Sequence, residues 1–180
     1  SNHYIDVNSY LNNDIKSLMT VFNNPKIYHL VRDPRKVISS TFLRIDNSTI
    51  NKAPKNKNSM MKWLKEDKFY RICYNWSKTI KYLQSYDLEI IQLEKIIESY
   101  DYFHQKLSLP LNLKIEEKTW ANYRVKKINK TRNMAYRKII SFLKSRDFSN
   151  EKIDFNHLNE QNLHVYNKFC KPLMESLGYE

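Results

Sequence analysis

The sequence predicts a single α/β domain in which short parallel strands are covered by helices. Three observations lead to this class. Apolar runs of strand length at 27–31 and 88–93 alternate with longer segments whose apolar residues recur at helical spacing. The chain has 180 residues, of which 41% are apolar and 13% aromatic, enough for one hydrophobic core. It contains no internal repeat and no shift in composition, so residues 1–180 are expected to form one domain.

The N-terminal part is expected to begin with a strand and a helix. Residues 3–7 suit a short strand that ends at Asp6. Residues 10–22 place apolar side chains on one helical face, and the sequence Asn-Asn-Pro at 23–25 stops this helix.

The apolar run 27–31, typical of a central parallel strand, leads into a well-marked helix start. Asp33 suits the N-cap position. Pro34 suits the first helical position, where its missing N–H costs no hydrogen bond. We expect this helix to extend over 34–44. The polar stretch 46–59, rich in Asn and Lys, is then expected to form an exposed loop.

The middle of the chain is predicted to contain one long helix, a strand and a further helix. The long helix covers 60–85 and carries Trp63 and Trp76 among its apolar residues, so both are expected in the core. The apolar run 88–93 suits a second strand. Residues 94–106 return to helical spacing.

The C-terminal third is expected to be helical. The pattern is weak over 113–132, but helices suit 134–145 and 158–177. The second helix ends at Gly178, in a glycine stop. Gly178 is the single glycine of the chain, so a glycine-rich phosphate loop cannot be built from these 180 residues.

The chain is strongly basic, with 31 Lys and Arg against 19 Asp and Glu and a net charge of +12. Such a surface favours polyanions, including nucleic acids, anionic glycans, phosphate-bearing cofactors and anionic membranes. Residues 124–138 carry basic side chains and no acidic one. Solvated lysines without a specific partner are an equally good explanation for any single basic residue.

Cysteine and histidine usage argues against a metal centre. Cys73 and Cys170 each fall on the apolar stripe of an expected helix and are interpreted as small core residues. The five histidines include no pair at ligand spacing, so no metal is expected. No apolar run approaches a membrane span and no signal peptide is recognised. This segment is therefore expected to be soluble, with the cytoplasm slightly favoured.

Arg32 and Ser40 are the first candidate ligand-binding residues. In an open parallel sheet, ligands bind where strands end and helices begin, which is where Arg32 stands. An arginine offers a forked donor to a phosphate, and the Ser40 hydroxyl adds a hydrogen bond. The alternative is a plain strand-to-helix turn, in which Asp33 caps the helix and the arginines pair with surface acids. Arg35 is interpreted as a surface residue.

These residues carry a resemblance to a known family. The sequence at 27–42, hydrophobic-Arg-Asp-Pro-Arg-x-Val-Ile-Ser-Ser, resembles the 3′-phosphate-binding motif of sulfotransferases that use 3′-phosphoadenylyl sulfate. The resemblance implies that Arg32 and Ser40 hold the 3′-phosphate of this cofactor and of its product, adenosine 3′,5′-bisphosphate. It also implies a P-loop-NTPase-like three-layer fold. The reaction would be sulfuryl transfer to a hydroxyl or amine acceptor, possibly a glycan.

Further segments are similar to the family in the same order. Asn75-Trp76 resembles its tryptophan helix, and 88–94 its strand ending in Tyr-Glu-Asp-Leu, of which only Glu94 is kept. The segment 125–131 resembles a basic Asn-x-Ser/Thr segment, and 170–179 the last helix of bacterial and Golgi-type members. Glu94 is expected to be a structural hydrogen-bonding residue or a helix cap.

The departure from the family is the missing phosphosulfate-binding loop, which normally lies N-terminal to this region. The resemblance therefore implies a C-terminal, partial sulfotransferase domain that is inactive alone, with its catalytic residues unassigned. His3 and Asp6 are weak candidates for proton transfer, and Trp120 for base stacking. A basic lid over the 3′-phosphate is expected from Lys126, Lys127, Lys130 and Arg132.

Two other functions stay open. A basic nucleic-acid-binding module would use the charge and the many tyrosines to follow phosphates, with steep salt dependence. A non-catalytic member of the sulfotransferase fold would keep the architecture without the reaction. Nucleic acid is an expected partner only under the first of these alternatives.

Overall fold

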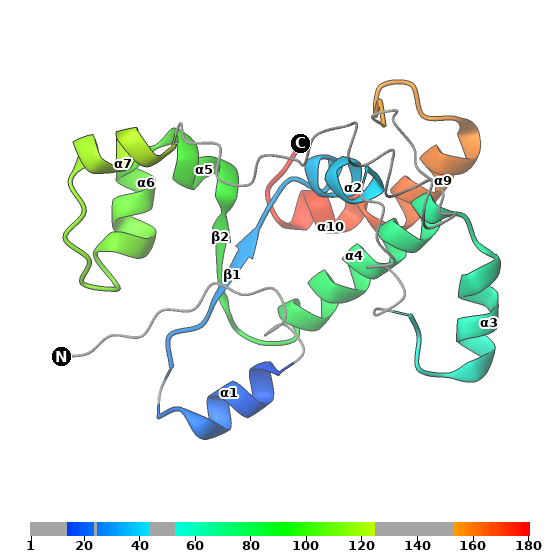
Figure 1. The fold of residues 1–180 in the computed structure, drawn as a ribbon, viewed down its shortest axis with the longest axis horizontal. Helices are drawn as coiled ribbons and strands as arrows, with labels where there is room; N and C mark the ends of the chain where they lie inside the picture. The colour runs from blue at the N-terminus through cyan, green and yellow to red at the C-terminus, as the bar shows by residue number, and fades with distance from the viewer. Residues whose placement is uncertain (1–13, 24, 44–52, 125–152) are drawn as a thin grey trace, which may run out of the picture.

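The computed structural model describes residues 14–23, 25–43, 53–124 and 153–180. In these residues the fold is mostly helical around a small parallel sheet of two strands, β1 (Tyr28–Val31) and β2 (Glu89–Gln92) (Figure 1). Their register pairs Tyr28 with Glu89 and Val31 with Gln92. Both strands therefore end at the same edge. The predicted α/β class with parallel strands is confirmed at this level.

The strand-to-helix turn after β1 forms as the sequence predicts. Helix α2 (Pro34–Phe42) starts with Pro34 at its first position, and the Asp33 carboxylate accepts a hydrogen bond from the Arg35 N–H at 2.8 Å. The buried residues Val31 and Ile38 anchor the strand end and the helix in the core. This local geometry fixes where Arg32 and the exposed face of α2 lie.

The long helix predicted over 60–85 is wrong in one respect, because it is two helices, α3 (Lys57–Lys65) and α4 (Lys68–Gln84). Helix α3 also takes the last residues of the predicted 46–59 loop. The break falls at Asp67, whose carboxylate accepts a hydrogen bond from the Tyr70 N–H at 2.7 Å and so caps a new helix. A capping side chain here competes with continued helix.

Changing Asp67 to alanine is expected to lower the free energy of unfolding by about 1 kcal/mol, because α4 loses this cap. Urea unfolding followed by circular dichroism measures the change. Asp14→Ala is the matched control, because Asp14 precedes α1 (Ile15–Val21) without a side-chain capping hydrogen bond. Equal destabilisation by the two substitutions would contradict a capping role for Asp67.

The helix predicted over 94–106 is likewise divided. After β2 come α5 (Leu93–Glu98), α6 (Tyr100–Phe103) and a π-helix, η3 (His104–Ser108). The Ser99 hydroxyl accepts a hydrogen bond from the Tyr102 N–H at 3.2 Å and starts α6. The weak pattern over 113–132 includes a further helix, α7 (Glu117–Arg124).

The C-terminal helix predicted over 158–177 is two helices, α9 (Glu160–Phe169) and α10 (Lys171–Ser176), which meet at Cys170. Gly178 has a φ of +77°, a left-handed conformation that favours glycine, so the predicted glycine stop is confirmed. The predicted strand over 3–7, the first residues of the helix over 10–22 and the helix over 134–145 lie outside the described residues.

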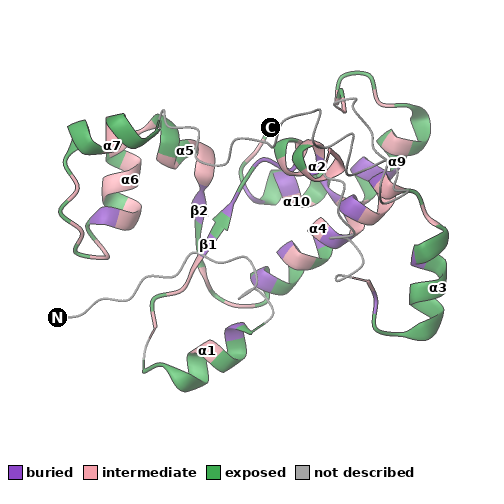
Figure 2. Ribbon diagram, in the orientation of Figure 1, coloured by how far each residue is buried: buried purple, intermediate pink, exposed green. Residues whose placement is uncertain are grey.

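The core lies between α2, α4 and the C-terminal helices, where buried residues gather (Figure 2). Trp63 is 3% exposed. Trp76 packs against the main hydrophobic cluster and against a second one formed by Val31, Ile80 and Leu177, as the sequence predicts. Cys73 and Cys170 are fully buried free cysteines, which confirms their interpretation as core residues. The main cluster consists of Ile38, Phe69, Ile72, Cys73, Val165, Tyr166, Cys170 and Met174.

Candidate anion-binding site

The candidate site lies at the edge where both strands end. Arg32 follows β1 and Glu94 lies just after β2, and the register places these two strand ends side by side. Helix α2 starts from this edge, and α5 follows β2 there (Figure 1). The sheet topology thus brings together residues more than sixty positions apart, at the kind of edge where α/β proteins bind ligands.

Arg32 is accessible and weakly held. Its side chain is 45% exposed, and its Nε lies 3.9 Å from Glu94 Oε1. That distance makes an ion pair without a hydrogen bond. Arg32 therefore keeps its N–H donors for an incoming anion.

Arg35 lies at the surface, as the sequence suggests, and its side chain is bound to Asp33. Its Nε and Nη2 donate to the Asp33 carboxylate at 2.9 to 3.1 Å, and its side chain is 39% exposed. The hydrogen bond with Asp33 raises the pKa of Arg35 despite partial burial. Asp33 thus caps α2 and forms an ion pair with Arg35. For Arg35, this is the arrangement expected of a plain strand-to-helix turn.

Ser40 is exposed on α2, and Lys36 lies one turn before it on the same side of the helix. Ser40 stands six residues after Pro34, about 9 Å along the helix axis. No hydrogen bond joins Ser40 to Arg32, which is exposed at the start of α2, whereas Ser40 is exposed in its last turn. To bind the same anion as Ser40, the long Arg32 side chain would have to extend along α2.

Glu94 is the hydrogen-bonding centre of this edge. Its Oε1 accepts from the Asp33 N–H at 3.3 Å and from Lys36 Nζ at 3.4 Å, while Oε2 accepts from the Tyr179 hydroxyl at 2.9 Å. Burial raises the pKa of Glu94, but the hydrogen bonds from Tyr179 and the backbone and the charge of Lys36 outweigh it, so the net pKa is lowered. The predicted structural role of Glu94 is confirmed.

The C-terminal residues 177–179 contact the ends of both strands. Gln92 Nε2 donates to the carbonyl of Leu177 at 2.6 Å and to that of Gly178 at 3.3 Å. The Tyr179 hydroxyl also contacts the Val31 carbonyl oxygen at 3.4 Å. Burial and the neighbouring Glu94 carboxylate raise the pKa of Tyr179, so its hydroxyl stays protonated at neutral pH.

Sequence reasoning missed Lys36, Gln92 and Tyr179. Lys36 could have been found from its place between Arg32 and Ser40 at helical spacing. Gln92 and Tyr179 carry no such signal, because their partners are 85 or more positions away in the chain.

The remaining candidates fall into two groups. Trp120 has a structural partner, because its Nε1 donates to the Ile96 carbonyl at 2.9 Å and the Arg124 guanidinium lies over its ring at 4.8 Å. His29, in β1, is buried, and burial lowers its pKa. The other candidates lie outside the described residues: His3, Asp6, Lys126, Lys127, Lys130 and Arg132.

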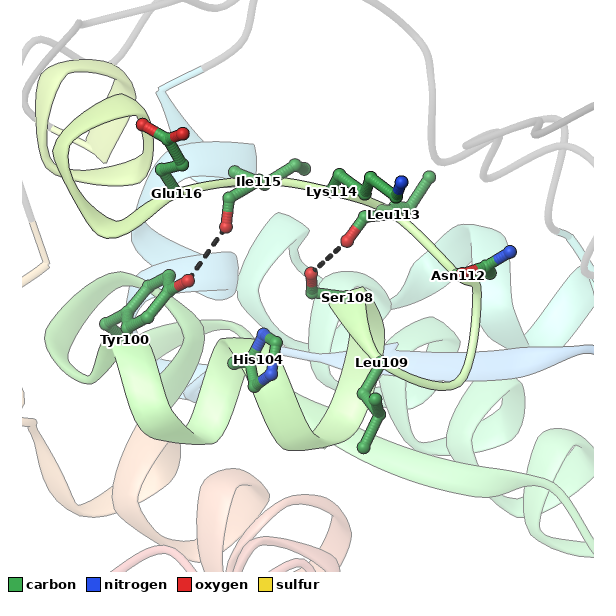
Figure 3. Close-up of a pocket in the computed structure, with 9 residues that line it drawn as sticks. All are labelled: Tyr100, His104, Ser108, Leu109, Asn112, Leu113, Lys114, Ile115 and Glu116. Atoms are coloured by element: carbon green, nitrogen blue, oxygen red, sulfur yellow. Dashed lines mark hydrogen bonds between the residues drawn. The ribbon is translucent and has the colours of Figure 1, made fainter.

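A separate pocket of about 340 Å³ lies between the η3 segment and the loop that follows it (Figure 3). The Tyr100 hydroxyl donates to the Ile115 carbonyl at 2.8 Å, and the Ser108 hydroxyl donates to the Leu113 carbonyl at 2.6 Å, so both hydroxyls hold this loop. His104 contributes a buried Nδ1 that has no hydrogen-bond partner. None of the residues singled out from the sequence lines this pocket.

The described residues contain neither a metal-binding cluster nor a membrane-spanning helix. No group of three or more His, Cys, Asp or Glu side chains in those residues is arranged to hold a metal ion. No helix within them has the length and apolar character needed to cross a membrane.

Comparison with protein-family models, with curated proteins and with solved structures found no match in any of the three. The site must therefore be judged on its own residues.

Proposed function

We propose that this chain binds 3′-phosphoadenylyl sulfate and belongs to a sulfotransferase of P-loop-like three-layer fold. The observation that supports the proposal most directly is the Arg32-to-Ser40 segment. Arg32 directly follows a parallel strand and has an exposed guanidinium, and Ser40 is exposed on the helix that follows. This placement is what the sequence resemblance requires of residues that hold a 3′-phosphate.

The residues at this edge fit a phosphate group. Arg32 offers charge-assisted donors, and Ser40 offers a hydroxyl, while Asp33 is neutralised by Arg35 and does not repel an anion. When bound, the cofactor would supply an activated sulfuryl group. The chain's own part would be to hold and orient the nucleotide end. The 180 residues contain one glycine, so they supply no glycine-rich loop for the 5′-phosphosulfate end.

The acceptor would be a hydroxyl or amine compound. The net charge of +12 favours an anionic acceptor such as a glycan. The same charge supports the second candidate function, a nucleic-acid-binding module, whose affinity for RNA or DNA would fall steeply with salt and show no preference for a 3′,5′-bisphosphate. A non-catalytic member of the fold would bind the nucleotide without transferring sulfate.

Isothermal titration calorimetry with adenosine 3′,5′-bisphosphate tests the proposal. We expect saturable binding that Arg32→Ala weakens about tenfold or more, because a charge-assisted phosphate contact is lost. Ser40→Ala should weaken it about fivefold, the effect of one neutral hydrogen bond. Adenosine 5′-monophosphate, which lacks the 3′-phosphate, should bind more weakly and be insensitive to both substitutions.

Lys78→Ala is the control, because Lys78 is an exposed lysine of α4 with the same charge. The proposal fails if the bisphosphate does not bind, or if Arg32→Ala and Lys78→Ala have the same effect. Steep salt-dependent binding of RNA with no bisphosphate binding would favour the nucleic-acid module.

A further inference from the structure

The turn after β1 and helix α2 carry three exposed polar side chains. Arg32 directly follows β1, whereas Lys36 and Ser40 lie one turn apart on the same side of α2. The side chains of Arg32 and Lys36 are 45% and 52% exposed, whereas Ile38, which lies between Lys36 and Ser40 in the sequence, is fully buried. These three residues therefore present two positive charges and one hydroxyl to solvent.

The two cations converge on one atom. Arg32 Nε lies 3.9 Å and Lys36 Nζ 3.4 Å from the same oxygen, Glu94 Oε1. They are thus close enough for a single phosphate group to reach both. An ammonium carries three N–H donors and a guanidinium five, so each cation can face Glu94 and still donate to a ligand.

The Glu94 carboxylate, which lies near both cations, is held in place by a hydrogen bond to its other oxygen. The Glu94 side chain is 17% exposed, and its second oxygen accepts from the Tyr179 hydroxyl at 2.9 Å. Tyr179 belongs to the C-terminal turn, which Gln92 fastens to the sheet through the Leu177 carbonyl. The orientation of Oε1 towards Arg32 and Lys36 therefore depends on a residue that lies far along the chain.

We propose that Lys36 is a second cation of the phosphate site and that Tyr179, through Glu94, positions Lys36 and Arg32 around it. The inference rests on the proposed function, since it names further residues of the same site. It also gives the C-terminal turn a part in ligand binding: the site is assembled only when residues 177–179 are docked against the strand ends. Tyr179 acts here as a positioning residue.

Calorimetry with adenosine 3′,5′-bisphosphate and adenosine 5′-monophosphate separates this role from a structural one. Lys36→Met keeps the aliphatic chain and removes the charge, and we expect it to weaken bisphosphate binding about tenfold. Tyr179→Phe keeps the ring and should weaken it about fivefold, the effect of one hydrogen bond. Both variants should leave monophosphate binding unchanged, whereas general destabilisation would affect the two ligands alike. Lys78→Met serves as the charge-matched control.

Nitrogen-15 NMR of the ligand-free protein provides a readout that does not need the nucleotide. Tyr179→Phe is expected to shift the Arg32 Nε and Lys36 Nζ resonances, and Lys78→Met is expected to leave them in place. Unshifted resonances in Tyr179→Phe would overturn the positioning role. If Arg32→Ala abolishes bisphosphate binding but Lys36→Met binds like the wild type, the proposed function stands and Lys36 is not a ligand. If the wild type binds no bisphosphate, the proposed function and the ligand role of Lys36 both fail. The NMR shifts then still test whether Tyr179 positions Arg32 and Lys36.

Discussion

Replacement of Ile38 by alanine is expected to lower the free energy of unfolding by about 3 kcal/mol. Ile38 is fully buried and packs in the cluster that joins α2 to α4 and the C-terminal helices. Its truncation removes buried apolar surface and leaves a cavity between helices that cannot fully close around it. Because α2 also carries Lys36 and Ser40, the same change should reduce ligand affinity.

Urea unfolding followed by circular dichroism measures the loss. Ile97→Ala is the matched control, because it makes the same chemical change at a side chain that is 42% exposed. We expect its effect to stay within about 1 kcal/mol. Comparable losses in Ile38→Ala and Ile97→Ala would mean that Ile38 does not anchor α2 in the core.

Replacement of Glu94 by alanine is expected to cost about 2 kcal/mol at pH 7, because the Tyr179 hydroxyl and the Asp33 N–H lose a charged acceptor. Glu94→Gln, which keeps the shape but does not titrate, shows how much of the effect depends on charge. Glu175→Gln is the control, since Glu175 is exposed on α10 and its substitution should change stability by less than about 0.5 kcal/mol.

The effect of Glu94 should depend on pH in a defined direction. Its folded-state pKa is lowered below the ordinary value of 4.5, so the carboxylate is stabilised by folding. Its contribution is fully present above the ordinary pKa and is lost as the pH falls through the folded-state pKa. The stability difference between wild type and Glu94→Gln should therefore be constant between pH 7 and about pH 5.5 and shrink on further acidification. A difference that grows in acid would contradict this.

The sequence was a good guide wherever the determinants of structure are local. The strands at 27–31 and 88–93 could be recognised as short apolar runs, although neither is buried on both faces, since Leu30 is 46% and Ile90 37% exposed. The start of α2 was recognisable because Asp33 and Pro34 suit the two positions that open a helix. The stop at Gly178 followed from the left-handed backbone that glycine adopts at low cost.

Helix breaks were the main error. Apolar periodicity predicts one continuous helix in each of the segments 60–85, 94–106 and 158–177, whereas the structure divides each of them. Asp67 and Ser99 cap new helices at two of the breaks, and both are capping residues that could have been recognised. Their capping role competes with a continued helix, and packing decides between the two outcomes.

The α/β character of the chain, its net positive charge and the Arg32-to-Ser40 segment as the candidate site can all be predicted from local sequence patterns and composition. These features depend on composition and on residues that are near one another in the sequence. The folded chain alone reveals that Glu94 and Tyr179 meet at the end of β1 and that Lys36 and Arg32 both lie near one oxygen of Glu94. Contacts between distant parts of the chain follow from strand register and helix packing, which a local pattern does not encode.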